Sequence, residues 1–199
     1  MPKRAEIGAP TTGRERVLTA AWALFASDGY AEVSMQTIAN AAGVNKATLY
    51  HHFGDKEQLF VAVLGAEFAQ LRIAIADSID VGRPFRDNLV AVADVIFGRS
   101  RSDSIRLMMT MHQHVSLMRR YKLAEETVPP WTDLRELFLR EIERGAIRTR
   151  DIDFAVTVLF GAVIFQAQRA RFMGVSTSDE QLAVDIVDLY LHGLSSGTP

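Results

Sequence analysis

The segment SMQTIANAAGVNKATLYHHF, residues 34–53, decides the fold of this chain. Two short runs of helical periodicity lie on either side of Gly43, and Ser34 and Asn45 are predicted N-caps for them. Two helices of about two turns cross near 100° when their contact is small and the turn admits a left-handed residue. Ala39 provides the small contact, and Gly43 suits the turn. The segment therefore predicts a helix-turn-helix.

The remainder of the 199-residue chain also has helical spacing of its apolar residues, without an alternation of period two over five or more residues. The pattern predicts an all-α protein of about nine helices. We expect an amino-terminal three-helix helix-turn-helix domain and a larger helical domain. The expected divisions are an arm at 1–11, the helix-turn-helix domain at 12–58, a connecting helix at 55–78 and the larger domain at 80–199.

Composition excludes several classes of function. The chain has no cysteine, which removes disulfide scaffolds, thiolate metal sites and cysteine nucleophiles. It has no glycine-rich phosphate loop, no Gly-x-Ser-x-Gly elbow and no His-Glu-x-x-His. The longest apolar run, 154–165, is short for a bilayer span, and the amino terminus has no apolar stretch typical of a secretory signal. We expect a cytoplasmic protein that is not an enzyme and has no metal, cofactor or membrane partner.

The charge balance at first argues against nucleic acid, because DNA-binding domains are usually basic. The chain carries 22 Lys and Arg against 24 Asp and Glu. Residues 1–60 are neutral, with equal numbers of each, so the net charge of −2 comes from the rest of the chain. Residues 33–54 contain Lys46 and no acid. The segment that would meet DNA is therefore locally positive, and the scarcity of cations predicts modest nonspecific affinity.

The second helix of the motif has an outer face suited to a major groove. Ile38, Ala42, Val44 and Leu49 are predicted to pack on the preceding helix, which leaves three other side chains outward: Lys46, Thr48 and Tyr50. They provide a cation, a hydroxyl and an amphipathic ring, the groups that a recognition helix uses. From these residues alone, an ordinary helical hairpin with a glycine turn remains the alternative.

Several spaced pairs and triplets extend the pattern through residues 16–60. They are ALF at 23–25, GY at 29–30, IA at 38–39, AGV at 42–44, LY at 49–50, HF at 52–53, KE at 56–57 and LF at 59–60. In this stretch, about a quarter of the chain, the sequence closely resembles the amino-terminal domain of TetR-family transcriptional regulators. The remainder has the helix number and lengths of that family's effector-binding domain.

The resemblance implies a set of DNA-contacting residues: Ser34, Gln36, Asn45, Lys46, Ala47, Thr48, Tyr50, His51, His52 and Lys56. Lys46 is the expected base reader, because guanine O6 and N7 accept hydrogen bonds from lysine. Tyr50, His52 and Lys56 match positions that contact phosphates. A core aromatic is the alternative for Tyr50, and a solvated histidine is the alternative for His52.

Two helices near the carboxyl terminus predict a homodimer. The segment 151–173 is apolar on nearly every side, and the last helix, about 178–193, has two apolar stripes. A helix that is hydrophobic all round must be covered all round. Two such helices from each chain would form a four-helix interface about a twofold axis, as the family does. A monomer whose core contains both helices is the alternative.

A methionine-rich segment predicts an effector pocket in the larger domain. Flexible thioethers suit an adaptable apolar cavity, although they also serve as ordinary core residues, and both interpretations stay open. The expected lining residues are Met108, Met111, His112, Val115, Trp131, Phe138, Phe160 and Phe165, with Gln166 and Arg169 as polar anchors. For His112 and Arg169 the alternatives are a core histidine and a solvated arginine.

Taken together, the sequence predicts a homodimeric, sequence-specific transcriptional regulator that binds double-stranded operator DNA. By resemblance it is a repressor, which a small and largely apolar effector releases from its operator. One alternative is an activator or a ligand-independent factor with the same DNA-binding domain. The other is a helical protein-interaction module without a role on DNA.

Overall fold

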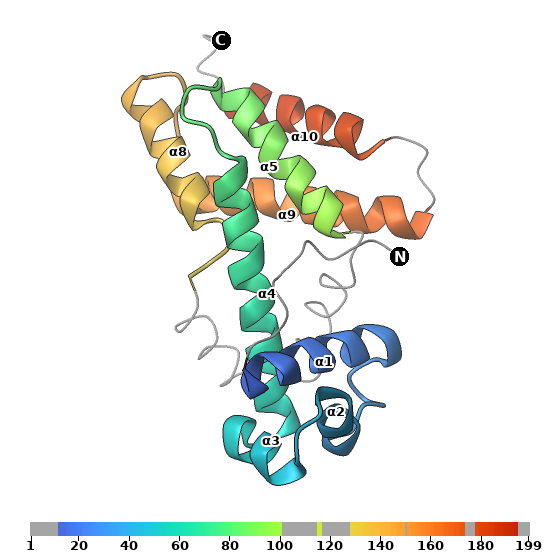
Figure 1. The fold of residues 1–199 in the computed structure, drawn as a ribbon. Coiled ribbons are helices and arrows are strands. Elements are labelled where there is room, and N and C mark those ends of the chain that lie inside the picture. Colours follow the sequence, from blue (N-terminus) through green and yellow to red (C-terminus); the bar gives the residue numbers. More distant parts are fainter. Residues whose placement is uncertain (1–11, 101–114, 117–127, 150, 174–177, 195–199) are drawn as a thin grey trace. The chain divides into compact units, whose positions relative to one another are not determined.

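The computed structural model describes residues 12–100, 115–116, 128–149, 151–173 and 178–194. Its regular elements in these ranges are eight α-helices, which confirms the predicted all-α class (Figure 1). They are α1 (Gly13–Asp28), α2 (Met35–Ala42), α3 (Lys46–Phe53), α4 (Lys56–Ser78), α5 (Phe85–Ser100), α8 (Thr132–Glu143), α9 (Ile152–Met173) and α10 (Asp179–Leu194). The methionine-rich segment with Met108, Met111 and His112 lies outside the described residues.

The described residues form two compact units, each with its own core. The first unit comprises 12–68 together with 115–116 and 128, and the second comprises the rest. The division falls within α4, whose beginning belongs to the first unit and whose end belongs to the second. The bounds expected from the sequence for the two functional domains, 12–58 and 80–199, therefore differ from the bounds of these compact units.

In the first unit, helix ends form where the sequence provides caps. Thr12 caps α1 in a reciprocal capping box with Glu15, whose side chain accepts from the Thr12 backbone N–H. Ser34 and Asn45 cap α2 and α3 as predicted, each side-chain oxygen accepting a backbone N–H three residues later. Gly43 follows α2 with φ of +63°, the left-handed conformation that the turn requires.

The core of this unit brings α1, α2, α3 and the first turns of α4 together. Phe60 is fully buried, and its ring lies 5.2 Å from the Phe25 ring and 4.9 Å from the Tyr30 ring between centroids. The predicted inward residues of the motif are buried or partly buried in this cluster, next to Leu18, Ala21 and Phe25 of α1: Ile38, Ala39, Ala42, Val44 and Leu49. The predicted packing of the helix-turn-helix on the preceding helix is thus confirmed residue by residue.

The second unit packs α5 against α9 and α10, and α8 against α9 (Figure 1). Its core is rich in aromatic rings: Phe138 is fully buried between Phe85 and Tyr190, at 5.1 and 6.3 Å between centroids. The Tyr190 hydroxyl donates to the Ala155 carbonyl at 2.7 Å, which ties α10 to α9. Burial raises the pKa of this phenol well above its ordinary value.

A buried amide fixes the turn between α4 and α5. Asn88 is fully buried, and its Nδ2 group donates to the carbonyls of Asp80 and Arg83 at 2.8 and 3.1 Å. Its Oδ1 atom accepts the Asp80 backbone N–H at 2.9 Å. Because every polar group of this side chain has a partner, a buried amide is tolerated here and holds the turn in one conformation.

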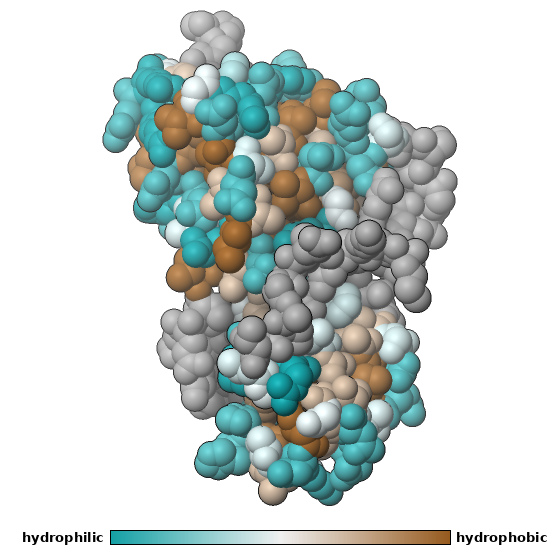
Figure 2. Space-filling model, in the orientation of Figure 1, coloured by the Kyte–Doolittle hydropathy of each residue, from teal (hydrophilic) through white to brown (hydrophobic). Residues whose placement is uncertain are grey.

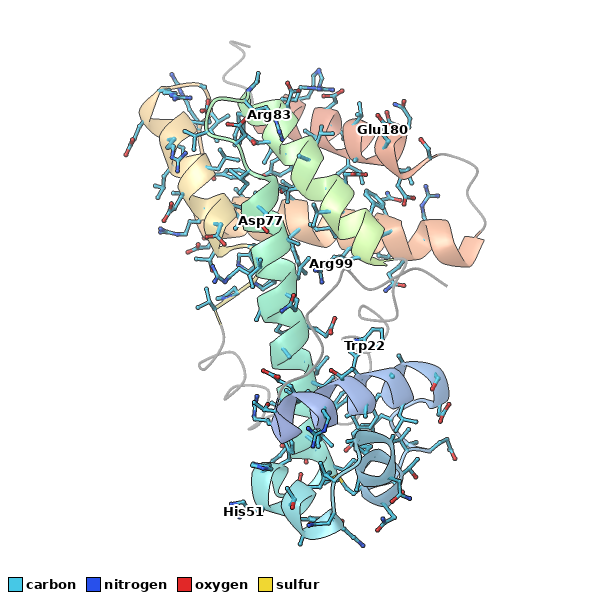
Figure 3. The ribbon with its side chains drawn as sticks, viewed as in Figure 1. Trp22, His51, Asp77, Arg83, Arg99 and Glu180 are labelled. Atoms are coloured by element: carbon cyan, nitrogen blue, oxygen red, sulfur yellow. The ribbon has the colours of Figure 1, made fainter. Side chains whose placement is uncertain are left out.

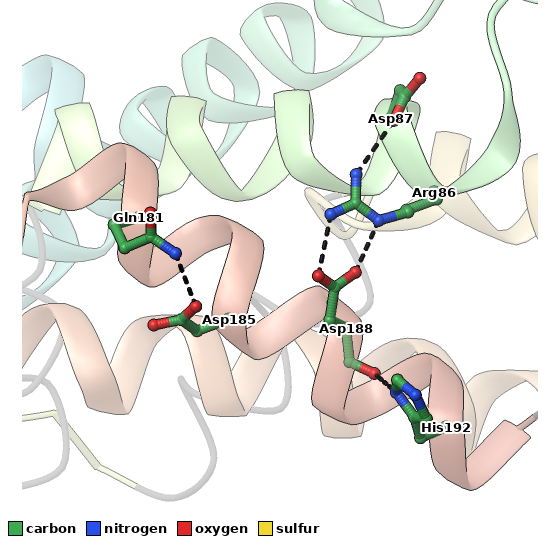
Figure 4. A network of polar contacts seen from close by, with 6 residues as sticks. All are labelled: Arg86, Asp87, Gln181, Asp185, Asp188 and His192. Carbon is green, nitrogen blue, oxygen red and sulfur yellow. Dashed lines mark hydrogen bonds and ion pairs between the residues drawn. The ribbon is translucent and has the colours of Figure 1, made fainter.

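An ion pair on the surface joins α5 to α10 (Figure 4). Arg86 binds the Asp188 carboxylate with two parallel bonds, Nε to Oδ1 at 2.6 Å and Nη2 to Oδ2 at 2.9 Å, and reaches Asp87 at 3.2 Å. His192, one turn after Asp188, contacts the Asp188 carbonyl. The hydrogen bonds from Arg86 hold the pKa of the Asp188 carboxyl below its ordinary value, although partial desolvation opposes that shift.

Two helices are long and apolar enough, by length and composition, to cross a membrane: α4, over Lys56–Ser78, and the Ile152–Arg169 part of α9. The 12-residue run noted in the sequence is thus part of a longer apolar helix. Both helices also contribute residues to a core, Leu59 and Phe60 from α4 and Val156 and Val163 from α9. Core helices of soluble proteins pass the same test, so this finding is weak evidence for a span.

Candidate nucleic-acid interface

The helix-turn-helix separates an apolar inner face from a polar outer face. On α2, the side chains of Met35, Ile38, Ala39 and Ala42 are buried, and those of Gln36, Thr37 and Asn40 are exposed. On α3, Leu49 and Phe53 are buried. The exposed set includes most of the residues predicted to contact DNA: Ser34, Gln36, Asn45, Lys46, Ala47, Tyr50, His51 and His52. Thr48 is half-buried.

The amino end of α3 presents a cation and a phenol together. Lys46 is the first helical residue, and its ammonium lies 5.7 Å from the centroid of the Tyr50 ring one turn later. Tyr50 is 41% exposed, so it is a surface aromatic and the core alternative for it is wrong. This pair can reach an acceptor-rich surface such as a groove edge or a phosphate.

The carboxyl end of α3 carries two exposed histidines. The rings of His51 and His52 lie 5.7 Å apart between centroids, and His51 points outward from the helix (Figure 3). His52 also lies beside the buried Phe53 ring, at 6.2 Å between centroids. Both imidazoles are therefore placed to meet a ligand at the end of the predicted recognition helix.

Lys56, predicted as a phosphate clamp, is engaged inside the first unit. Its ammonium donates to the Ala31 carbonyl at 3.1 Å and lies 4.4 Å from the centroid of the Tyr30 ring. Desolvation lowers the pKa of this ammonium, and the nearby Glu32 carboxylate opposes that shift. In this conformation Lys56 ties the start of α4 to the turn after α1, and its role as a DNA contact remains a prediction.

Two arginines of α1 contact the carboxyl ends of α2 and α3. The Arg16 Nε atom donates to the Ala42 carbonyl at 3.3 Å, at the end of α2. The Arg14 guanidinium lies 5.6 Å from the centroid of the Phe53 ring, at the end of α3. Neither contact could be predicted from the sequence, because Ala42 lies 26 residues after Arg16 and Phe53 lies 39 residues after Arg14.

In the second unit, several large apolar side chains are exposed. On α9, Phe154 and Phe165 are each 66% exposed and Val158 is 42% exposed, and on α10 Leu189 is 78% exposed. The three α9 residues lie at positions 154, 158 and 165, a spacing that places them on one stripe of the helix. The opposite side of α9 is buried in the core. Apolar side chains also reach the surface in the view of Figure 2.

The residues predicted to line an effector pocket do not all lie together. Trp131, Phe138 and Phe160 belong to the core of the second unit, with the Trp131 and Phe160 rings 5.1 Å apart between centroids. Val115 is buried in the core of the first unit instead. It occupies a bend, next to Ser116, whose backbone N–H donates to the Glu57 carboxylate at 2.6 Å.

The remaining pocket predictions also change or stay open. Phe165 lies on the exposed stripe of α9 and not beside Phe138, because the helix turns it away from the core. Gln166 and Arg169 are bonded to each other, Arg169 Nε donating to Gln166 Oε1 at 2.7 Å. The predicted residues Met108, Met111 and His112 lie outside the described residues. Within the described ranges, no three His, Asp or Glu side chains gather in a group that could hold a metal ion.

Comparison with known proteins identifies relatives of the whole chain. Residues 17–63 match the family described as bacterial regulatory proteins, tetR family. The HTH-type transcriptional repressor AcnR of Corynebacterium glutamicum is 27% identical over 188 residues, covering 90% of this chain and 92% of that protein. The HTH-type transcriptional repressor KstR2 of Rhodococcus jostii is 27% identical over 192 residues, covering 92% and 91%.

A solved structure shares the fold over nearly the full length. The transcriptional regulator FadR of Bacillus subtilis, crystallised with stearoyl-CoA, superimposes with a TM-score of 0.75. The match covers 90% of this chain and 98% of that one, at 19% sequence identity. At this identity the likeness concerns the fold alone.

Proposed function

Because the chain belongs to the tetR family of bacterial regulatory proteins, and is therefore a DNA-binding transcriptional regulator, we propose that it represses transcription from an operator that it binds as a homodimer. The observation that carries this proposal is the outer face of α3. There Lys46, Tyr50 and the Asn45 cap are exposed on a helix whose inner face is fixed in a core. Repression is favoured because relatives aligned over most of the chain, AcnR and KstR2, are named repressors.

In this proposal α3 enters a major groove and α2 crosses the DNA backbone, as in other helix-turn-helix proteins. Lys46 would read a guanine edge, and Tyr50, His51 and His52 would contact phosphates on the flank of the helix. One such motif contacts too few base pairs for genomic specificity, which favours a pair of motifs on a pseudopalindromic site.

The apolar stripe of α9, together with Leu189 of α10, supports dimerisation through these two helices. A large apolar patch left exposed by a folded chain marks a surface that another protein covers. Two copies of the stripe related by a twofold axis would bury each other's Phe154, Val158 and Phe165. The interface proposed from the sequence, 151–173 and 178–193, contains all of these residues.

We also propose a small, largely apolar effector that binds in the second unit and releases the operator. The aromatic residues Trp131, Phe138 and Phe160 provide apolar surface there. The same fold accommodates stearoyl-CoA, a ligand with a long apolar chain, in the Bacillus subtilis neighbour. An effector releases DNA only if it binds the released state more tightly than the DNA-bound state.

Selection of duplexes from a random-sequence pool by the purified protein tests the proposal. We expect a pseudopalindromic consensus, and we expect Lys46→Ala to weaken binding to it and to relax preference at one base position in each half-site. The loss should be about 1–3 kcal/mol for each lost base contact. Unchanged affinity and unchanged preference would show that α3 is not the recognition helix.

The direction of regulation and the effector need two further measurements. Transcription from the selected site with purified polymerase should fall when the protein is added, whereas an activator would raise it. Compounds that raise the melting temperature of the protein should then weaken its binding to the selected site. If none of the stabilising compounds changes operator binding, the proposed coupling is wrong.

A further inference from the structure

The outer face of α2 is polar but carries no charge. Its eight residues, MQTIANAA, contain no acid and no base, and Gln36 and Asn40 lie one turn apart on the exposed face. The first helix of a helix-turn-helix crosses the DNA backbone. On this chain, the helix expected to lie nearest the phosphates therefore offers them neutral groups alone.

The described cations of the first unit are few, and most have protein partners. Arg16 donates to the Ala42 carbonyl, and Lys56 donates to the Ala31 carbonyl. The Arg14 guanidinium lies over the Phe53 ring. Within residues 12–60, Lys46 on the exposed start of α3 has a ring contact of the same kind, with Tyr50. Because the cations in this range are few, neutral donors on the same surface can add phosphate contacts.

Two exposed amides have the orientation that this requires. The Oδ1 atom of Asn40 accepts from Gln36 Nε2 at 2.9 Å, and the Oδ1 atom of Asn45 accepts from the Thr48 backbone N–H at 2.7 Å. In each case the acceptor of the amide is used within the protein, and the Nδ2 group, with two N–H donors, is what remains. A phosphate oxygen only accepts hydrogen bonds, so it is the matching partner for such a group.

We propose that Asn40 binds a DNA phosphate through its Nδ2 group, as a neutral contact of α2 that works together with Asn45 at the start of α3. The inference rests on the proposed function, because it assumes that the helix-turn-helix binds duplex DNA. The bond from Gln36 positions Asn40 by occupying its oxygen and so directs the donor side of the amide outward.

A neutral contact has a distinctive effect on salt dependence. Each phosphate that a cation neutralises adds about 0.9 to the slope of log K against log salt, because counterions are released. A neutral donor strengthens binding but does not neutralise the phosphate, so no counterion is released from the DNA. Asn40→Ala should therefore lower affinity at every salt concentration and leave the slope unchanged, whereas Lys46→Ala should reduce the slope.

The test measures binding of a mixed-sequence duplex of about 30 base pairs between about 50 and 200 mM salt. We expect Asn40→Ala to weaken binding about tenfold in the dimer, as two lost hydrogen bonds would. Asn40→Asp retains the acceptor for Gln36 and replaces the donor with an oxygen that repels phosphate, so it should bind more weakly than Asn40→Ala. Ala41→Asp is the matched charge control, because it adds the same charge one residue along and keeps the Asn40 donor.

Asn45 provides an independent variant whose folding is protected. Aspartate caps a helix as well as asparagine does and is favourable at a helix amino terminus. Asn45→Asp should therefore keep or raise the melting temperature while it lowers DNA affinity at least about tenfold.

The outcomes separate this inference from the proposed function. If the unsubstituted protein binds the duplex and Asn40→Ala binds it equally well, Asn40 is not a contact and the inference is wrong. The inference is also wrong if Asn40→Asp binds DNA better than Asn40→Ala does, because Asn40 would then only support Gln36. It is wrong as well if Asn40→Asp binds DNA no more weakly than Ala41→Asp does. If the unsubstituted protein binds no duplex, the proposed function itself fails, and this inference fails with it.

Discussion

The two units of the molecule differ in what they leave on their surfaces. The outer face of the helix-turn-helix has amides, hydroxyls, imidazoles and one lysine, and its exposed large apolar residue within 12–68 is Tyr50, which has a polar hydroxyl. The second unit leaves Phe154, Phe165 and Leu189 two-thirds or more exposed. The first surface suits a polar, charged ligand such as DNA, and the second suits a second copy of an apolar surface.

This difference arises from how completely each unit closes its own core. In the first unit the short helices α2 and α3 bury one face each, and their other faces are polar. In the second unit α9 is apolar on two sides, and the single chain covers one of them. Within 12–68 the helix-turn-helix thus leaves a polar face outward, whereas α9 of the second unit has apolar surface left for a partner.

The largest expected effect comes from opening the closed core. Phe60→Ala should destabilise the first unit by about 3–5 kcal/mol, because it removes a fully buried ring and leaves a cavity between Phe25 and Tyr30. Hydrogen exchange should show that amides of α1, α2 and α3 lose protection. Tyr50→Ala is the control, since this ring is exposed in the same unit. Equal loss of protection in both variants would contradict the closed core.

A charge on the α9 stripe tests the open side of the second unit. Phe165→Asp should raise the dissociation constant of the dimer about a hundredfold or more, because a carboxylate would be buried in an apolar interface without a partner. Sedimentation equilibrium measures this shift. Val81→Asp, which replaces another exposed apolar side chain of this unit, should leave association unchanged. If both variants associate like the unsubstituted protein, another surface forms the dimer or the protein is a monomer.

The smallest expected effect concerns the exposed ion pair of Arg86 and Asp188. Arg86 lowers the pKa of the Asp188 carboxyl in the folded state. The Asp188 carboxyl therefore binds fewer protons in the folded protein than in the unfolded chain. The stabilisation that the ion pair gives to the folded state is present above the ordinary aspartate pKa. It is lost as the pH falls through the lower pKa of Asp188 in the folded state. Asp188→Asn should lower the denaturation midpoint slightly at neutral pH, because solvent screens exposed pairs.

Under acid, the difference between Asp188→Asn and the unsubstituted protein should become smaller. Asp185→Asn is the control, because Asp185 accepts a hydrogen bond from the neutral Gln181 amide on the same helix (Figure 4). A difference that stayed constant from neutral pH to acid would mean that the charge of Asp188 contributes nothing.

Much of the helix-turn-helix could be predicted from the sequence because its determinants are local. A cap bonds to an N–H three residues away, and a left-handed turn needs a glycine at one position, so Ser34, Gly43 and Asn45 were identified without the fold. The inward residues followed from helical period. The DNA contacts predicted at residues 34–52 are on the outer face for the same reason, with Thr48 only half-exposed.

Other parts of the candidate sites depend on contacts between distant segments. Lys56 was expected to be free for a phosphate, but the carbonyl that it binds belongs to Ala31, 25 residues earlier. Val115 was assigned to the second unit by its place in the chain, and it is buried in the first. Phe165 was assigned to a pocket because it is apolar, and hydropathy does not tell which side of an apolar helix faces the core.

Local sequence thus established the helices, their caps and the polar face that the family relationship assigns to DNA. The partition of α9 into a buried and an exposed side, and the pairing of each cation and amide with its partner, came from the packing of the chain. The physical reason is range. Helical period and capping act over three to four residues, whereas burial depends on which segments, tens of residues apart, share a core.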